Sequence, residues 1–192
     1  MLTRVESLQG VAFTGSLPTA KKIQSNLIQY QDQIIHLIAE TGGINCMLVD
    51  SSALLEQVTD DVVRSAFDSA GQRCSALRVL CIQEEIYEEL VEMIKGNMII
   101  QKVGNPNEFD TDIGPIINLE AIEKLNKYIE KCEIEGFDVF QASESLEKNY
   151  LSPTLISINQ ISDIKNEQFG PILHVLKYNS SDTDKLINDI NK

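Results

Sequence analysis

The chain has 192 residues, 43% of them hydrophobic and 23% charged, and a formal net charge of −13. This length suits one domain, or one domain with part of another, and the composition can build an ordinary hydrophobic core. The excess of 29 acidic over 16 basic residues argues against nucleic acid as a partner, since a phosphate backbone needs a basic surface. No apolar run approaches the roughly 18 residues of a membrane span, and the N-terminus lacks the apolar core of a signal peptide. We therefore expect a cytoplasmic protein without a membrane partner.

The first 50 residues alternate short apolar runs with turns. Residues 10–14 predict a short buried strand that leads into a Gly15-Ser16 turn, and Pro18 stands where a helix start tolerates proline. Apolar residues at helical spacing continue to about residue 29. Strands are predicted at 34–39 and 45–49, on either side of a glycine-containing break at 40–43.

The rest of the chain repeats this alternation. We predict helices at 53–69, 84–99, 119–135 and 182–190, and strands at 77–82, 137–140, 152–158 and 172–178. Loops are expected at 70–75, 104–115 and 167–171. Strands that alternate with helices predict an α/β fold.

Cysteine is the residue type with the clearest chemical potential. Cys46, Cys74, Cys81 and Cys132 form no CxxC pair and no zinc spacing, so we expect reduced thiols and no metal site. Cys74 differs from the others because it lies in a glycine-containing loop beside Arg73, whose positive charge would favour the thiolate. We interpret the other three thiols as packing residues.

Other polar residues have both a functional and a structural interpretation. Glu40 follows a predicted strand and precedes Gly42-Gly43, so it could turn toward a reacting centre, or it could be a solvated charge at a loop edge. The strand, Gly15-Ser16 turn and helix start could cradle a phosphate, although such turns are common. His36 and His174 lie in apolar runs, and we expect both to be core residues.

A fourth segment completes the set of candidates. Residues 167–171, with sequence Glu-Gln-Phe-Gly-Pro, could bind a ribose through Glu167 and flank a ring through Phe169, or could be only a turn before a strand. Singly, none of these segments is decisive. The order of four segments along the chain is more informative than any one of them. The segments are Phe13-Thr14-Gly15-Ser16, Glu40-Thr41-Gly42-Gly43, Gly71-Gln72-Arg73-Cys74-Ser75-Ala76 and Glu167-Gln168-Phe169-Gly170-Pro171.

In this order the chain resembles the aldehyde dehydrogenase superfamily across nearly its whole length, and Glu40 and Cys74 are 34 positions apart, as in that family. The stretch from Ala66 to Arg78 is similar to the L-glutamate γ-semialdehyde dehydrogenase (1-pyrroline-5-carboxylate dehydrogenase) half of bifunctional proline utilization A. The resemblance implies an aldehyde dehydrogenase-like catalytic domain with the last part of a Rossmann-like NAD-binding domain. It divides the chain into a C-terminal remnant of the NAD-binding domain, residues 1–43, and a truncated catalytic domain, residues 44–192.

The resemblance also implies roles for individual residues. Cys74 would be the nucleophile that attacks the aldehyde, its backbone N–H would help to stabilise the oxyanion, and Glu40 would activate water. Arg73 and Ser75 would contact the substrate. The remaining residues that the resemblance assigns to the cofactor NAD, together with Glu40, are Gly15, Ser16, Gly42, Glu167 and Phe169.

The family pattern also includes parts that we expect outside this chain, among them an Asn oxyanion donor and most of the cofactor sheet. Loss of one such donor costs about 10²–10³ in rate, so we expect the isolated chain to be poorly active. Three alternatives remain open. The first is NAD-dependent oxidation of L-glutamate γ-semialdehyde, and the second is the same chemistry on another aldehyde, such as succinate semialdehyde. The third is a non-catalytic fragment that forms a homo-oligomer or associates with a chain that carries the missing NAD-binding half.

Overall fold

A computed structural model of the chain describes residues 2–143 and 149–192. The chain divides into two compact units, Met1–Gly43 and Ile44–Lys192, hereafter unit 1 and unit 2. The boundary coincides with the one predicted from the sequence. The assignment of the units to an NAD-binding domain and a catalytic domain stays a prediction.

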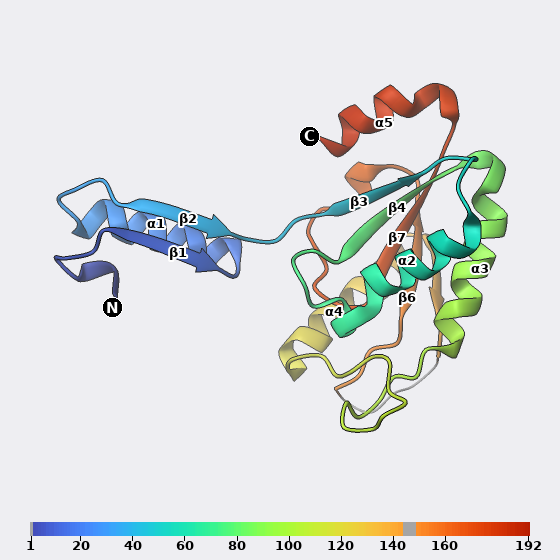
Figure 1. Ribbon diagram of the computed structural model, residues 1–192, viewed down its shortest axis with the longest axis horizontal. Coiled ribbons are helices and arrows are strands. Elements are labelled where there is room, and N and C mark those ends of the chain that lie inside the picture. The colour runs from blue at the N-terminus through green and yellow to red at the C-terminus, as the bar shows by residue number, and fades with distance from the viewer. Residues whose placement is uncertain (1, 144–148) are drawn as a thin grey trace. The chain divides into compact units, whose positions relative to one another are not determined.

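Unit 1 contains two parallel strands and one helix, preceded by a short 3₁₀ turn. Strand β1 (Gly10–Thr14) pairs with β2 (His36–Glu40), and helix α1 (Leu17–Tyr30) connects them (Figure 1). Ser16 caps α1, and proline stands in its first turn, as expected for a helix start. The crossover helix is the usual connection between parallel strands.

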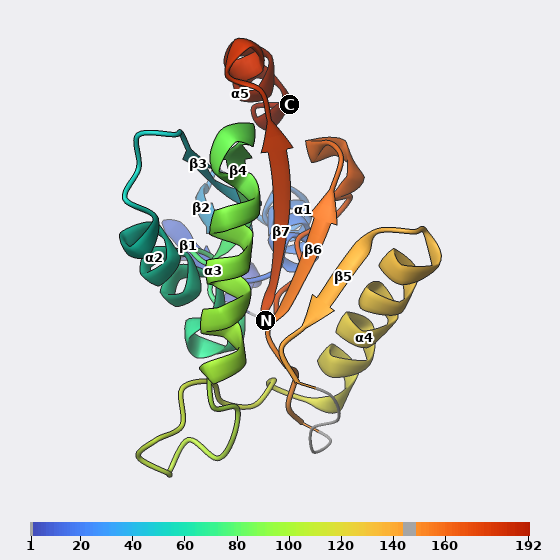
Figure 2. The same ribbon diagram turned by 90° about the vertical axis from the view of Figure 1, so that its right-hand side faces the viewer.

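Unit 2 is built on a five-stranded sheet in the order β3-β4-β7-β6-β5 (Figure 2). Its strands are β3 (Asn45–Val49), β4 (Leu77–Gln83), β5 (Asp138–Gln141), β6 (Thr154–Ile158) and β7 (Ile172–Tyr178). All neighbours are parallel except β5 and β6, which are antiparallel. Every residue of β4 is buried, which explains why this strand reads as an apolar run instead of an alternating pattern.

The helices of unit 2 are α2 (Leu55–Phe67), α3 (Tyr87–Ile100), α4 (Leu119–Ile134) and α5 (Thr183–Ile190). Helices α3 and α4 cover opposite faces of the sheet. On β7, Lys177 contacts Tyr87 and Glu88 of α3, whereas His174 bonds to Tyr128 of α4. Residues 174 and 177 point to opposite faces because side chains alternate along a strand.

The main core lies in unit 2, where the sheet meets its helices. Phe67 of α2, Leu80 of β4, Ile94 of α3 and Ile156 of β6 are at most 1% exposed. The described part of the chain contains no helix that is both long and apolar enough to cross a membrane.

The structure corrects several details of the prediction. Strand β1 was expected to be buried, yet alternate residues are exposed because few elements cover this small sheet. His36 was expected in the core and is exposed on β2, whereas His174 is buried as predicted. The predicted helix 53–69 ends at Phe67, because the chain then enters a 3₁₀ turn (Asp68–Gly71) with left-handed residues inside it.

Candidate active site

The four cysteines, all within the described residues, differ sharply in environment. Cys81 and Cys132 are buried, Cys46 is half-buried, and Cys74 is exposed. Burial raises the pKa of the Cys46 and Cys132 thiols and raises the pKa of Cys81 to about 12. Because the thiolate is the reactive form, burial disfavours reaction at these three thiols, and Cys74 is the exposed one of the four.

The segment before Cys74 has an unusual backbone. Ser69, Ala70 and Gly71 all have positive φ, at 58°, 54° and 63°. Left-handed conformations cost roughly 1–2 kcal/mol for each residue other than glycine. A Cβ atom on Gly71 would also lie 2.2 Å from the carbonyl oxygen of Gly170. The turn is therefore strained, and only glycine fits at its last position.

Two amide side chains fasten the loop that follows this turn. The Gln72 Nε2 group donates to the Pro115 carbonyl at 3.1 Å, and Gln72 Oε1 accepts from the Ile117 N–H at 2.9 Å. On the other side, Asn45 Nδ2 donates to the carbonyls of Cys74 at 2.7 Å and Ala76 at 2.9 Å. The nucleophile candidate thus has a fixed backbone although its side chain is exposed.

Arg78 connects the Cys74 loop to the segment 167–171. Its side chain is 1% exposed and donates to the carbonyls of Arg73 and Gly170, each at 3.1 Å. It also donates from Nε and Nη2 to Glu167 Oε1, at 3.3 and 3.2 Å, and its guanidinium carbon lies 5.4 Å from the centre of the Phe169 ring. One buried cation therefore holds both loops at the amino ends of the adjacent strands β4 and β7.

The predicted cofactor residues Glu167 and Phe169 are accordingly placed together. The Glu167 side chain is 17% exposed, and Phe169 is 46% exposed. A carboxylate is a suitable acceptor for ribose hydroxyl groups, and an exposed ring offers a flat apolar contact. The structure brings both side chains to the Arg78 guanidinium, which also bonds to the backbone of the Cys74 loop.

The predicted substrate residues Arg73 and Ser75 flank Cys74 but differ in orientation. The Arg73 guanidinium turns toward the end of α2, where its Nη2 group donates to the carbonyls of Arg64 at 3.1 Å and Ser65 at 3.3 Å. Its Nε atom is buried without a hydrogen-bond partner among the described residues. Ser75 is exposed. Arg73 thus fills the role of a helix cap, and a substrate role for either residue stays a prediction.

The predicted site residues of unit 1 lie at or just after the carboxyl ends of β1 and β2. Thr14 is in register with Glu40, and the Gly15 N–H donates to the Glu40 carbonyl at 3.0 Å. The Ser16 side chain accepts from the Thr19 N–H at the start of α1, and both Ser16 and Glu40 are exposed. A helix start that follows a glycine turn is chemically suited to an anion such as a dinucleotide phosphate. Gly42 is exposed just beyond β2.

The sequence analysis did not identify Arg78, Asn45, Tyr128 and His174 as residues that act together. Arg78 carried a usable signal, because it is a charged residue inside the apolar run that forms β4. The partners of these residues are far away in sequence, so no local pattern could identify them. In the described part of the chain, no group of three or more His, Cys, Asp or Glu side chains is placed to hold a metal ion.

Comparison with known proteins gives this geometry a context. The chain is 47% identical over 201 residues to the bifunctional protein PutA of Klebsiella aerogenes, a match that covers 99% of this chain and 15% of that protein. It is 33% identical over 178 residues to the 1-pyrroline-5-carboxylate dehydrogenase of Oceanobacillus iheyensis, covering 90% of this chain and 35% of that one. The chain therefore spans only a fraction of these relatives.

Solved structures agree with the sequence relatives. A proline utilization A (PutA) mutant of Bradyrhizobium japonicum superposes with a TM-score of 0.95 at 39% identity, covering 99% of this chain and 20% of that one. A glyceraldehyde-3-phosphate dehydrogenase of Methanocaldococcus jannaschii, complexed with NADP, superposes with a TM-score of 0.85 at 25% identity, covering 97% of this chain and 40% of that one. The model of the aldehyde dehydrogenase family also matches this chain, over residues 1–192. The chain belongs to the aldehyde dehydrogenase family.

Proposed function

We propose that this chain is the thiol-bearing part of an NAD-dependent dehydrogenase that oxidises L-glutamate γ-semialdehyde to L-glutamate in proline catabolism. The observation that supports this most is Cys74, an exposed thiol on a loop whose backbone is fixed from both sides by Asn45 and Arg78. A fixed backbone with an accessible sulfur favours a well-aligned attack. The relatives named PutA and 1-pyrroline-5-carboxylate dehydrogenase support the choice of aldehyde.

In this proposal, the Cys74 thiolate forms a carbon–sulfur bond with the aldehyde carbon, and the carbonyl oxygen becomes an oxyanion. The backbone N–H of Cys74 stabilises that charge. NAD, when bound, supplies the acceptor for the hydride. Loss of hydride converts the Cys74 thiohemiacetal into a thioester. Glu40 then removes a proton from water, the resulting hydroxide attacks the thioester carbon, and the carbon–sulfur bond breaks to release the acid and the Cys74 thiolate.

The residues proposed to hold NAD fit its chemistry. Gly15 and Ser16 precede the amino end of α1, which suits the pyrophosphate. Gly42 would allow the backbone to approach the cofactor closely. Glu167 would accept from the ribose hydroxyls, and Phe169 would pack beside the ring. Ser75 would contact the substrate carboxylate next to the nucleophile, and Arg73 would also contact the substrate.

We expect the 192 residues alone to be poorly active. The described part of unit 1 supplies two strands and one helix, whereas a dinucleotide-binding fold uses several βα repeats. The test is a single-turnover assay with the chain in excess over L-glutamate γ-semialdehyde in the presence of NAD, and NADH is followed by absorbance. Succinate semialdehyde serves as the competing substrate, and Cys74→Ala serves as the control.

NADH formed with L-glutamate γ-semialdehyde in preference to succinate semialdehyde, and lost in Cys74→Ala, would support the proposal. NADH formation that survives in Cys74→Ala would contradict the role of Cys74. Equal rates with both aldehydes would contradict the choice of substrate. If the chain forms no NADH, the acyl transfer assay described at the end of the Discussion tests Cys74 and Glu40 without a cofactor.

One observation favours association with another chain as an additional property. Ile34 and Ile38 of unit 1 are 95% and 64% exposed, and Ile28 of α1 is 79% exposed. Exposed apolar surface of this kind promotes assembly. We expect a light-scattering mass above that of the monomer, lowered by Ile38→Asn. A strictly monomeric chain at high concentration would contradict this expectation.

A further inference from the structure

Two polar side chains, those of Tyr128 and His174, and the backbone carbonyl of Arg78 meet in unit 2, each from a different element. His174 of β7 and Arg78 of β4 are each 1% exposed. The His174 Nδ1 atom lies 3.0 Å from the Arg78 carbonyl oxygen, and the His174 Nε2 atom lies 2.7 Å from the hydroxyl of Tyr128 on α4. These contacts link helix α4, through the sheet, to the residue that connects the two loops of the candidate active site.

The contacts of His174 and its burial together indicate its protonation. A carbonyl oxygen can only accept, so His174 Nδ1 must carry a proton and donate to Arg78. Burial lowers the pKa of His174 to about 4, which favours the neutral ring. In the neutral ring, Nε2 accepts from the Tyr128 hydroxyl. Burial likewise raises the pKa of Tyr128, which keeps its hydroxyl protonated as a donor.

Arg78 also occupies an irregular position in the sheet. The consecutive residues Asn45 and Cys46 of β3 pair with Leu77 and Val79 of β4, so Arg78 is an extra residue in a bulge. Bulges occur next to active sites, where they redirect a side chain. Here the redirected guanidinium reaches Glu167 and the carbonyls of Arg73 and Gly170. The carbonyl of the bulged residue is the group that His174 binds.

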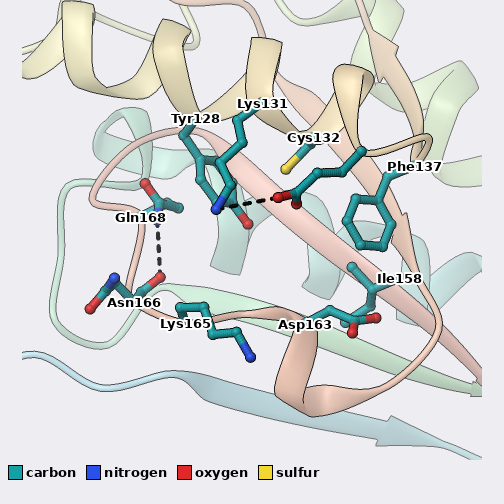
Figure 3. Close-up of a pocket in the computed structure, with 10 residues that line it drawn as sticks. Tyr128, Lys131, Cys132, Phe137, Ile158, Asp163, Lys165, Asn166 and Gln168 are labelled. Atoms are coloured by element: carbon teal, nitrogen blue, oxygen red, sulfur yellow. Dashed lines mark hydrogen bonds and ion pairs between the residues drawn. The ribbon is translucent and has the colours of Figure 1, made fainter.

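The face of α4 that carries Tyr128 also borders the loop that leads to Glu167. Tyr128 and Gln168 line the same small pocket (Figure 3). The polar groups there are occupied with one another, as Lys131 pairs with Glu135 and Gln168 donates to the Asn166 carbonyl. The pocket therefore marks the junction between α4 and this loop, and its chemistry does not indicate a ligand.

We propose that Tyr128 and His174 are positioning residues for the active site. They hold the bulge at Arg78, and through Arg78 they set the relative placement of the Cys74 loop and the segment 167–171. This inference rests on the proposed function only in taking Cys74 and Glu167 as site residues. The placement of the loops can be measured without catalysis, so a failure of either proposal is distinguishable from a failure of the other.

The test uses amide hydrogen exchange of the full chain in four variants. His174→Leu removes the donor to the Arg78 carbonyl, whereas His174→Asn retains a donor at the Nδ1 position. Tyr128→Phe removes only the hydroxyl. Tyr178→Phe is the matched control, because it also removes a buried hydroxyl, bonded to the Val49 carbonyl at 3.3 Å, at the opposite end of β7. Exchange is compared at residues 72–76 and 167–171 and across the sheet.

We expect exchange at these two loops to accelerate about tenfold in His174→Leu, as the loss of one buried hydrogen bond implies. Exchange in His174→Asn should stay close to that of the parent. Tyr128→Phe should give a smaller acceleration at the same loops, and Tyr178→Phe none there. If His174→Leu does not fold, the proposal is tested by comparing exchange at the two loops in Tyr128→Phe with that in Tyr178→Phe.

Three outcomes would overturn the proposal. The first is unchanged exchange at both loops in a folded His174→Leu chain or, where that chain does not fold, in Tyr128→Phe. The second is an equal acceleration throughout the sheet, which would indicate only a general loss of stability. The third is fast exchange of the loops in His174→Asn as well. The hydrogen bond to the Arg78 carbonyl would then not be what slows exchange in the parent chain.

Discussion

The two units place their candidate site residues in opposite ways. In unit 1, Gly15, Ser16 and Glu40 stand at or just after the carboxyl ends of the parallel strands β1 and β2. In unit 2, Cys74 and Glu167 stand before the amino ends of the parallel strands β4 and β7. Carboxyl ends of strands are the usual ligand-binding edge of α/β sheets. Unit 1 follows that rule, and unit 2 departs from it.

The difference shows two means of fixing a site. In unit 1, local structure suffices, because strand register and a helix cap place Glu40 and Ser16. In unit 2, placement depends on side chains from distant parts of the sequence. Arg78 reaches Glu167 across 89 positions, and His174 reaches Arg78 across 96. Substitutions in unit 2 should therefore have larger effects than those in unit 1.

The largest effect is expected from Arg78→Met. This change removes the guanidinium that donates to the carbonyls of Arg73 and Gly170 and that pairs with the partly buried Glu167 carboxylate. Breaking a buried ion pair from one side costs about 3–5 kcal/mol, measured as the free energy of unfolding in urea. Lys102→Met is the control, because its two ion pairs are exposed and worth less than about 1 kcal/mol. Equal losses of unfolding free energy in both variants would contradict the role of Arg78 in holding the two loops.

A slightly smaller loss is expected from Gly71→Ala. The new Cβ would meet the backbone of Gly170 at a left-handed position, and we expect a cost of about 3 kcal/mol. Gly96→Ala in α3 is the matched control, since a Cβ there meets nothing within 4 Å. That variant should gain about 0.5–1 kcal/mol from helix propensity. A neutral Gly71→Ala would show that the loops are not in close contact.

The third prediction concerns pH. His174 has a folded pKa of about 4, below its ordinary value of 6.5, so the unfolded chain binds the proton first as the pH falls. The stability that the neutral ring contributes is present above pH 6.5 and is lost between pH 6.5 and about 4. We expect this loss to reach about 2–3 kcal/mol and to disappear in His174→Asn. His36→Asn, on the exposed part of β2, should retain the pH dependence, and its disappearance there would contradict the assignment.

The smallest effect is expected in unit 1. Ser16→Ala removes the cap of α1 and should cost about 1 kcal/mol, seen as faster amide exchange in unit 1 with no change in unit 2. Ser25→Ala, in the interior of the same helix, removes no cap. If Ser16→Ala matched Ser25→Ala, the hydroxyl of Ser16 would have no capping role.

The same contrast explains what could be predicted from sequence. The periodicity of apolar residues was enough for every strand and α-helix to within a few residues, and the order of the four motifs along the chain was enough for the family. The bulge at Arg78 and the bonds of His174 depend on contacts between distant segments, which no local pattern specifies. His36 was misplaced for a related reason, because an apolar run predicts a strand but does not say whether another layer covers it.

The central proposal is that Cys74 carries the acyl group and that Glu40 activates the water that hydrolyses it. The most direct test is acyl transfer from p-nitrophenyl acetate, which needs no NAD, with acetylated residues identified by peptide mass spectrometry. We predict acetylation at Cys74, lost in Cys74→Ala, and hydrolysis slowed at least ~100-fold in Glu40→Gln, so that acetyl-Cys74 accumulates. Glu6→Gln, at another exposed carboxylate of unit 1, should behave as the parent. Acetyl-Cys74 that hydrolyses equally fast in Glu40→Gln, or acetylation confined to the other cysteines, would contradict the account.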